Sequence, residues 1–132
     1  MLQIKNTVTT KTISIDDYLE KNNVPVDKIS LVKIDTEGHE YSVLDGMRGL
    51  IKNGKSSFII ENNYLALKSA GVNLEIILNE FFFNKKYLVY WLESKNNNYV
   101  FSPEKVRKTI IDSSSVSDYN FRNGDFYVVP HG

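Results

Sequence analysis

A short apolar segment that stops at an acidic residue constrains the fold of this chain most strongly. Residues 29–34 place apolar side chains on both faces of an extended strand, and Asp35 follows them directly. A turn that contains Gly38 comes next, and an amphipathic segment begins near Glu40. This succession is typical of an α/β protein, in which a parallel strand covered on both faces presents polar groups at its carboxyl end.

The rest of the sequence alternates between strand and helix patterns. We expect one helix after the N-cap Ser14 and further helices over 40–53, 74–84 (after the N-cap Asn73) and 102–111. We expect strands near 8–13 and over 29–34, 58–60, 87–92, 99–101 and 126–129. Such alternation predicts right-handed crossovers and a mainly parallel sheet. The last two core strands lack a crossover helix, so they could pair as an antiparallel hairpin. Residues 112–123 are rich in Ser, Asp and Asn and predict a mobile loop.

Length and charge narrow the classes of function. A chain of 132 residues favours a single domain. It has 16 basic and 16 acidic residues, which argues against binding to nucleic acid or to an anionic membrane surface through charge. No apolar run reaches the roughly 20 residues of a membrane helix, and the start shows no signal-peptide pattern. The chain has no cysteine, which excludes thiol chemistry and agrees with the cytoplasmic location that we expect.

Acidic residues follow two neighbouring strands of the predicted sheet. Asp35 and Glu61 come directly after apolar runs, and parallel neighbours lie about 4.8 Å apart. Two close carboxylates can separate their pKa values or hold a cation together. His39 lies one turn further along and could reach the same edge. Alternatively, Glu37 and Glu40 only stabilise the first turn of a helix, and His39 is a surface or capping residue.

Several blocks of the sequence resemble the FkbM family of S-adenosylmethionine-dependent methyltransferases. They are residues 12–19 (TISIDDYL), 31–40 (LVKIDTEGHE), 43–46 (VLDG), 58–61 (FIIE) and 123–126 (NGDF). The resemblance implies a Rossmann-like class I methyltransferase sheet of seven strands that ends in a reversed hairpin. This chain would be a single partial domain, the C-terminal half, which supplies the fourth to seventh strands and lacks the N-terminal ones.

The resemblance also implies roles for individual residues. Asp35, Glu37 and Glu40 match the acidic motif beside the transferred methyl group, and Glu61 matches the acid that ends the next strand. The candidate catalytic residues are therefore Asp35, Glu37, His39 and Glu61. Asp35 and Thr36 are the candidate contacts to S-adenosylmethionine, and the number of ligands does not support a metal site.

The glycine-rich turn that holds the cofactor in this family has no counterpart in the sequence. The chain has seven glycines, and no Gly-x-Gly pair occurs. We therefore expect a fragment that methylates a hydroxyl of a sugar or small metabolite only within a longer enzyme. Without preceding strands, segment 29–34 would be an exposed sheet edge, covered by a second copy, by a separate N-terminal half or by the strand near 8–13. The alternatives are a non-catalytic assembly module and a metal-dependent phosphotransferase or hydrolase that uses Asp35.

Overall fold

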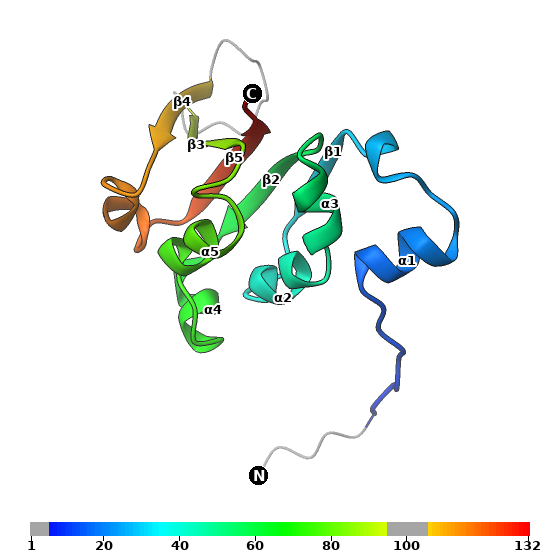
Figure 1. Ribbon diagram of the computed structural model, residues 1–132. Coiled ribbons are helices and arrows are strands. Elements are labelled where there is room, and N and C mark those ends of the chain that lie inside the picture. Colours follow the sequence, from blue (N-terminus) through cyan, green and yellow to red (C-terminus); the bar gives the residue numbers. More distant parts are fainter. Residues whose placement is uncertain (1–5, 95–105) are drawn as a thin grey trace.

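A five-stranded mixed sheet forms the centre of the protein, with the strand order β1-β2-β5-β3-β4 (Figure 1). The computed structural model describes residues 6–94 and 106–132. β1 and β2 are parallel, whereas the pairs β2–β5, β5–β3 and β3–β4 are antiparallel. The α/β class is confirmed. The strands are β1 (Leu31–Ile34), β2 (Ser57–Asn62), β3 (Tyr87–Ser94), β4 (Val106–Ile111) and β5 (Gly124–Pro130).

The prediction of a mostly parallel sheet is wrong for these strands, and the connections explain why. The helical crossover after β2 gives β3 the same direction as β2 but does not place the two strands side by side. β5 fills the space between them and is antiparallel to both. β4 adds a further antiparallel pair on the outer side of β3. The expected reversal near the C-terminus is therefore present, and it accounts for two of the three antiparallel pairs.

Side-chain caps define the helices largely as the sequence predicts. Ser14 accepts a hydrogen bond from the Asp17 N–H, and Asn73 accepts one from the Ile76 N–H. Gly54 ends α3 with a left-handed φ of 71°. The helices are α1 (Ile15–Lys21), α2 (Glu40–Asp45), α3 (Arg48–Asn53), α4 (Tyr64–Ser69) and α5 (Leu74–Phe81), with short 3-10 helices η1 (Val26–Lys28) and η3 (Val116–Tyr119). Of these, α4 was not predicted.

The predicted continuous helix over 40–53 is broken at Gly46 and Met47 into α2 and α3. The two carboxylate oxygens of Asp16 accept hydrogen bonds from the backbone N–H groups of Gly49 (2.7 Å) and Leu50 (3.2 Å). Asp16 belongs to α1, so a side chain from another helix satisfies first-turn donors of α3. The break is therefore a tertiary feature that the hydrophobic spacing of this segment does not reveal.

Two predicted elements are wrong. Residues 8–13 form no strand and do not pair with β1. Val8 in this segment is 86% exposed. Residues 106–111 form the strand β4 rather than the end of a helix, since their β-branched side chains suit a pairing with β3. The remainder of that predicted helix and the strand over 99–101 lie outside the described residues. The predicted loop over 112–123 contains η3, whose Val116 is buried; its mobility stays a prediction.

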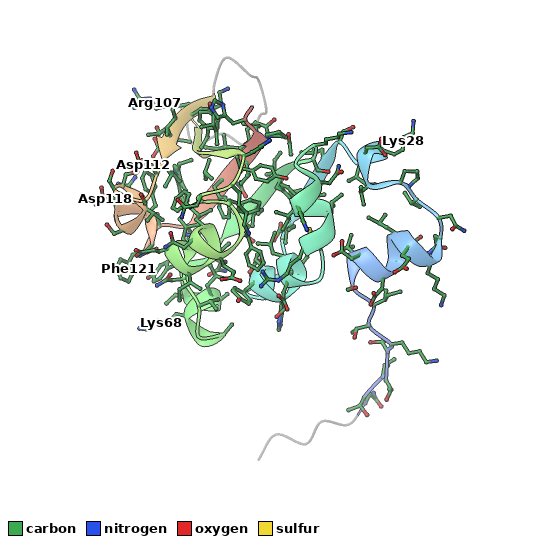
Figure 2. The ribbon with its side chains drawn as sticks, viewed as in Figure 1. Lys28, Lys68, Arg107, Asp112, Asp118 and Phe121 are labelled. Carbon is green, nitrogen blue, oxygen red and sulfur yellow. The ribbon has the colours of Figure 1, made fainter. Side chains whose placement is uncertain are left out.

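The hydrophobic core lies between one face of the sheet and the helices that follow β1 and β2. Alternate strand residues such as Phe58, Ile60, Val89 and Phe126 are buried there. The other face carries the remaining strand residues, which are half-buried or exposed, while Phe121 projects from the loop before β5 (Figure 2). β1 forms one edge of the described sheet. Within residues 6–94 and 106–132, no helix combines the length and hydropathy needed to cross a bilayer.

Candidate functional site

Three carboxyl groups converge at the carboxyl ends of the two parallel strands. β1 and β2 are in register through the pair Ile34 and Ile60, so Asp35 and Glu61 emerge at the same level. Glu37 reaches them from the turn that follows β1. One carboxylate oxygen from each of these acids lies within 4.8 Å of the others. We call Asp35, Glu37 and Glu61 the carboxyl cluster.

The two acids at the strand ends have opposite pKa shifts. A hydrogen bond with Glu61, together with Lys33, whose Nζ lies 3.2 Å from Oδ2, lowers the pKa of Asp35. The same bond with Asp35, followed by burial and by neighbouring acids, raises the pKa of Glu61 to about 7. Near neutral pH the two carboxyl groups can thus share one proton. Opposite pKa shifts of this kind are typical of carboxyl pairs that exchange protons with a ligand.

The turn between β1 and α2 depends on Glu40, which is fully buried. Its Oε1 accepts a hydrogen bond from the Thr36 N–H and its Oε2 accepts one from the Gly38 N–H, both at 2.9 Å. Gly38 has a φ of 103°, and a Cβ there would lie 2.7 Å from the Ala66 carbonyl oxygen. Glu40 therefore holds the backbone of the turn rather than facing the carboxyl cluster.

The conformation of the turn also directs the side chain of Glu37. This residue has a left-handed φ of 53°, and its Oε2 accepts a hydrogen bond from Asn63 Nδ2 at 3.2 Å. Asn63 in turn caps α4 through the Ala66 N–H. Glu37 is thus held between the other two acids of the carboxyl cluster and the start of α4.

The remaining predicted residues lie near this turn without joining the carboxyl cluster. His39 is exposed at the N-cap position of α2, and its side chain does not cap the helix. It is not among the carboxyl and imidazole groups that converge here. Thr36 is half-buried, and its Oγ1 has no hydrogen-bond partner among the described residues. Their suggested catalytic and cofactor-binding roles stay predictions.

Asp125 is a further acid that the sequence did not single out as a site residue. It lies opposite Glu61 in the β2–β5 register, and burial raises its pKa. Its charge contributes to the raised pKa of Glu61. Block 123–126 was recognised in the sequence, but only the insertion of β5 beside β2 brings this carboxyl to the site.

The arrangement can accept protons and hydrogen bonds from a ligand that carries hydroxyl groups. The three acids are also close enough together to hold a divalent cation, since Mg²⁺ binds through one or two carboxylates and completes its coordination with waters. Orientation and deprotonation of a hydroxyl need no such ion.

Comparison with known proteins gives two matches. The family model of the methyltransferase FkbM domain matches residues 2–101. The hexuronic acid methyltransferase AglP of Haloferax volcanii is 43% identical over 49 residues, which are 37% of this chain and 20% of that protein. The match thus spans about a fifth of the length of this curated relative. No solved structure matches the chain.

Proposed function

Because the chain belongs to the FkbM methyltransferase family, we propose that it supplies the acceptor-binding part of an S-adenosylmethionine-dependent O-methyltransferase. The acceptor is a hydroxyl of a sugar or a similar small metabolite. The observation that carries this proposal is the pairing of Asp35 with Glu61 at the ends of two parallel strands, with a pKa of about 7 for Glu61. The similarity to the hexuronic acid methyltransferase AglP supports a sugar acid as the class of acceptor.

The carboxyl cluster would bind the acceptor hydroxyl and take up its proton. With a pKa of about 7, a substantial share of Glu61 is deprotonated near neutral pH, and a group with such a pKa suits a general base at that pH. The acceptor hydroxyl donates a hydrogen bond to this pair, and its proton moves to a carboxylate oxygen as the hydroxyl oxygen becomes the nucleophile. Glu37, held by Asn63, accepts a hydrogen bond from a neighbouring hydroxyl and so fixes the orientation of the acceptor.

The residues of this chain do not form a complete site for S-adenosylmethionine, which supplies the electrophilic methyl group. The methionine part of that cofactor carries a carboxylate that requires hydrogen-bond donors. The carboxyl cluster offers acceptors, and the nearby Lys33 is engaged by Asp35. The sequence has no Gly-x-Gly turn that could supply backbone donors. We therefore propose that polypeptide outside these 132 residues binds the cofactor.

The free side of β1 supports a docking place for that additional polypeptide. In the described sheet β1 pairs only with β2, so its other side offers backbone donors and acceptors to a further strand. Leu31 on β1 is 55% exposed. We propose that a cofactor-binding half, rather than a second copy, extends the sheet here. A cytoplasmic location is part of the same proposal.

Two measurements test the proposed function. Calorimetry of the 132-residue chain with S-adenosylmethionine should show no micromolar binding, and such binding would contradict the need for a second part. In the native polypeptide that contains these residues, Asp35→Asn and Glu61→Gln should each lower kcat for methyl transfer by about 10²–10⁴-fold. Asp27→Asn, an exposed acid in η1, is the matched control and should retain activity.

The outcomes also separate the alternatives. Methyl transfer that survives both acid substitutions would refute the role of the Asp35–Glu61 pair. A native polypeptide that consists of these residues alone and transfers no methyl group would favour a non-catalytic assembly module. Phosphoryl transfer or hydrolysis that depends on a divalent metal and on Asp35 would favour the phosphotransferase or hydrolase alternative.

A further inference from the structure

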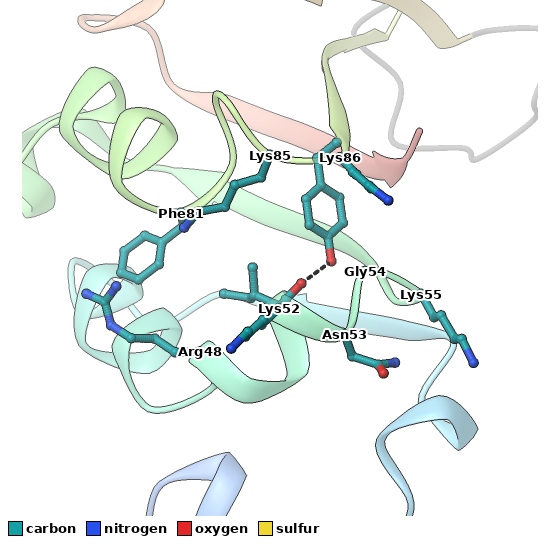
Figure 3. A pocket seen from close by; sticks show the side chains of 10 residues that line it. Arg48, Lys52, Asn53, Gly54, Lys55, Phe81, Lys85 and Lys86 are labelled. Carbon is teal, nitrogen blue, oxygen red and sulfur yellow. Dashed lines mark hydrogen bonds between the residues drawn. The ribbon is translucent and has the colours of Figure 1, made fainter. Parts of the chain in front are cut away.

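A pocket lies at the opposite end of the sheet from the carboxyl cluster. It has a volume of about 780 Å³, within the range of small-molecule sites. Its walls come from the C-terminal part of α3, the end of α5 and the segments that lead into β2 and β3 (Figure 3). Lys55 at its edge lies six residues before Glu61, which corresponds to roughly 20 Å of extended chain. We call it the basal pocket.

The rim of the basal pocket is strongly cationic. Five basic side chains border it, although the whole chain has equal numbers of basic and acidic residues. Figure 3 shows them spread around the opening rather than stacked on one side. They are Arg48, Lys52, Lys55, Lys85 and Lys86.

Two of these cations already have partners in the protein. Arg48 forms salt bridges with Asp45 (2.7 Å) and Glu80 (2.8 Å), and its guanidinium lies 4.8 Å from the centre of the Phe81 ring. Lys85 donates a hydrogen bond to the Glu80 carbonyl oxygen. These interactions hold both side chains in place on the left side of the pocket in Figure 3, and the two salt bridges offset the charge of Arg48.

The other three cations, Lys52, Lys55 and Lys86, are exposed and form no salt bridge or side-chain hydrogen bond with the described residues. Lys52 lies in the last turn of α3, where a cation stabilises the helix carbonyls. That reason does not apply to Lys55 and Lys86, which lie outside the helices. Three unpaired positive charges thus surround one concave surface.

The wall of the basal pocket between the cations is apolar. It is formed by Ile51, Phe81 and Tyr87, and the Tyr87 hydroxyl donates a hydrogen bond to the Ile51 carbonyl oxygen at 2.8 Å. This bond ties the end of α3 to the start of β3 and so holds two sides of the pocket together.

We propose that the basal pocket binds a small phosphomonoester whose organic part is aromatic or otherwise apolar. A phosphomonoester carries about two negative charges at neutral pH and three acceptor oxygens. Lys52, Lys55 and Lys86 supply the balancing charge and the hydrogen-bond donors, and the wall at Ile51 and Tyr87 contacts the organic part. A carboxylate, with one charge, would leave more of this positive charge uncompensated.

Calorimetric titration of the 132-residue chain with phenyl phosphate tests the proposal. The unmodified chain should bind saturably. The triple variant Lys52→Gln, Lys55→Gln, Lys86→Gln should bind at least tenfold more weakly, a loss of about 1.4 kcal/mol. The matched control is Lys21→Gln, Lys28→Gln, Lys68→Gln, which removes the same charge from exposed positions on α1, η1 and α4; Figure 2 shows Lys28 and Lys68 on the outside of the protein. The control should bind as the unmodified chain does.

Each contrary outcome overturns a defined part of the proposal. The absence of saturable binding up to about 10 mM, or equal weakening in the control variant, refutes a specific site. Inorganic phosphate should bind more weakly than phenyl phosphate, and equal affinities would refute the apolar contact. Binding of a single-stranded oligonucleotide without binding of phenyl phosphate would refute a small-molecule ligand. None of these results bears on methyl transfer, which is proposed for the other end of the sheet.

Discussion

The two hydrogen bonds of Glu40 allow a worked prediction for the variant Glu40→Ala. The substitution leaves two backbone donors without an acceptor. The Gly38 N–H is buried, so its loss should cost about 2 kcal/mol, whereas the Thr36 N–H is part-buried and should cost about 1 kcal/mol because water can reach it. We therefore expect the free energy of unfolding to fall by about 3 kcal/mol, a large share of the stability of a small domain.

Urea denaturation followed by the fluorescence of Trp91 measures this change, because that residue is the only tryptophan and is buried. Glu40→Gln keeps one acceptor oxygen and should lose roughly half as much. The control Glu20→Ala removes an exposed carboxylate and should stay within about 0.5 kcal/mol. A loss below about 1 kcal/mol in Glu40→Ala would show that the turn does not depend on these two bonds.

Three further predictions concern backbone conformation and pH. Gly38→Ala should destabilise far more than Gly71→Ala, because both have positive φ but only the first brings a Cβ within 3 Å of another residue; urea denaturation of both variants measures this. The stability of Glu61→Gln relative to the parent should increase as the pH rises from 4.5 to about 7. In that window the raised pKa of Glu61 makes the folded parent bind more protons than its unfolded chain, so the parent loses stability as the pH rises. Thermal unfolding of both proteins across this window tests the prediction. Gly124→Ala should destabilise and shift the Trp91 emission, since its Cβ would lie 2.6 Å from the indole ring.

Each of these three predictions has a defined result that would contradict it. Equal losses in the two glycine variants would mean that the left-handed φ, and not the contact with the neighbouring backbone, limits position 38. Parallel pH profiles for the parent and the Glu61 variant would contradict the raised pKa. An unchanged emission spectrum in the Gly124 variant would mean that the indole ring has room to move.

Local signals in the sequence were sufficient for most elements of the fold. Caps such as Ser14 and Asn73 and buried runs such as Phe58 to Ile60 act within a few residues, so their effect can be predicted without knowledge of the fold. Pairing of strands is not local. The sequence cannot show that β5 enters between β2 and β3, and this insertion converts the predicted parallel sheet into a mixed one.

The region 106–111 shows how a local signal can mislead. Val106 and Ile110 are spaced as on one face of a helix, and a Ser-Pro pair before them is a sequence pattern typical of a helix start. Four of the six residues over 106–111 are β-branched, and such side chains favour a strand when a partner is present. β3 provides the partner, with Tyr90 opposite Ile110. Tertiary pairing therefore decided between two patterns that the sequence supports equally.

The residues of the candidate site also differ in whether local sequence or strand pairing determines their position. Asp35 and Glu61 could be predicted to meet because each ends a buried strand and the two strands are neighbours in sequence. Asp125 could not, because its place depends on β5. His39 was grouped with the acids on sequence distance, but it is exposed at the start of α2 and does not join them.

The segment between Asp35 and Glu40 is best understood as a turn that positions an acid, rather than as a row of equivalent acids. Glu40 turns inward and binds the backbone of the turn. The turn then gives Glu37 its left-handed conformation, which directs its carboxylate towards Asn63 and the Asp35–Glu61 pair. Acids of the same type thus serve opposite purposes three residues apart, one buried and structural, the other exposed and available to a ligand. Glu40 is accordingly a positioning residue, since it affects the carboxyl cluster only through the backbone that carries Glu37.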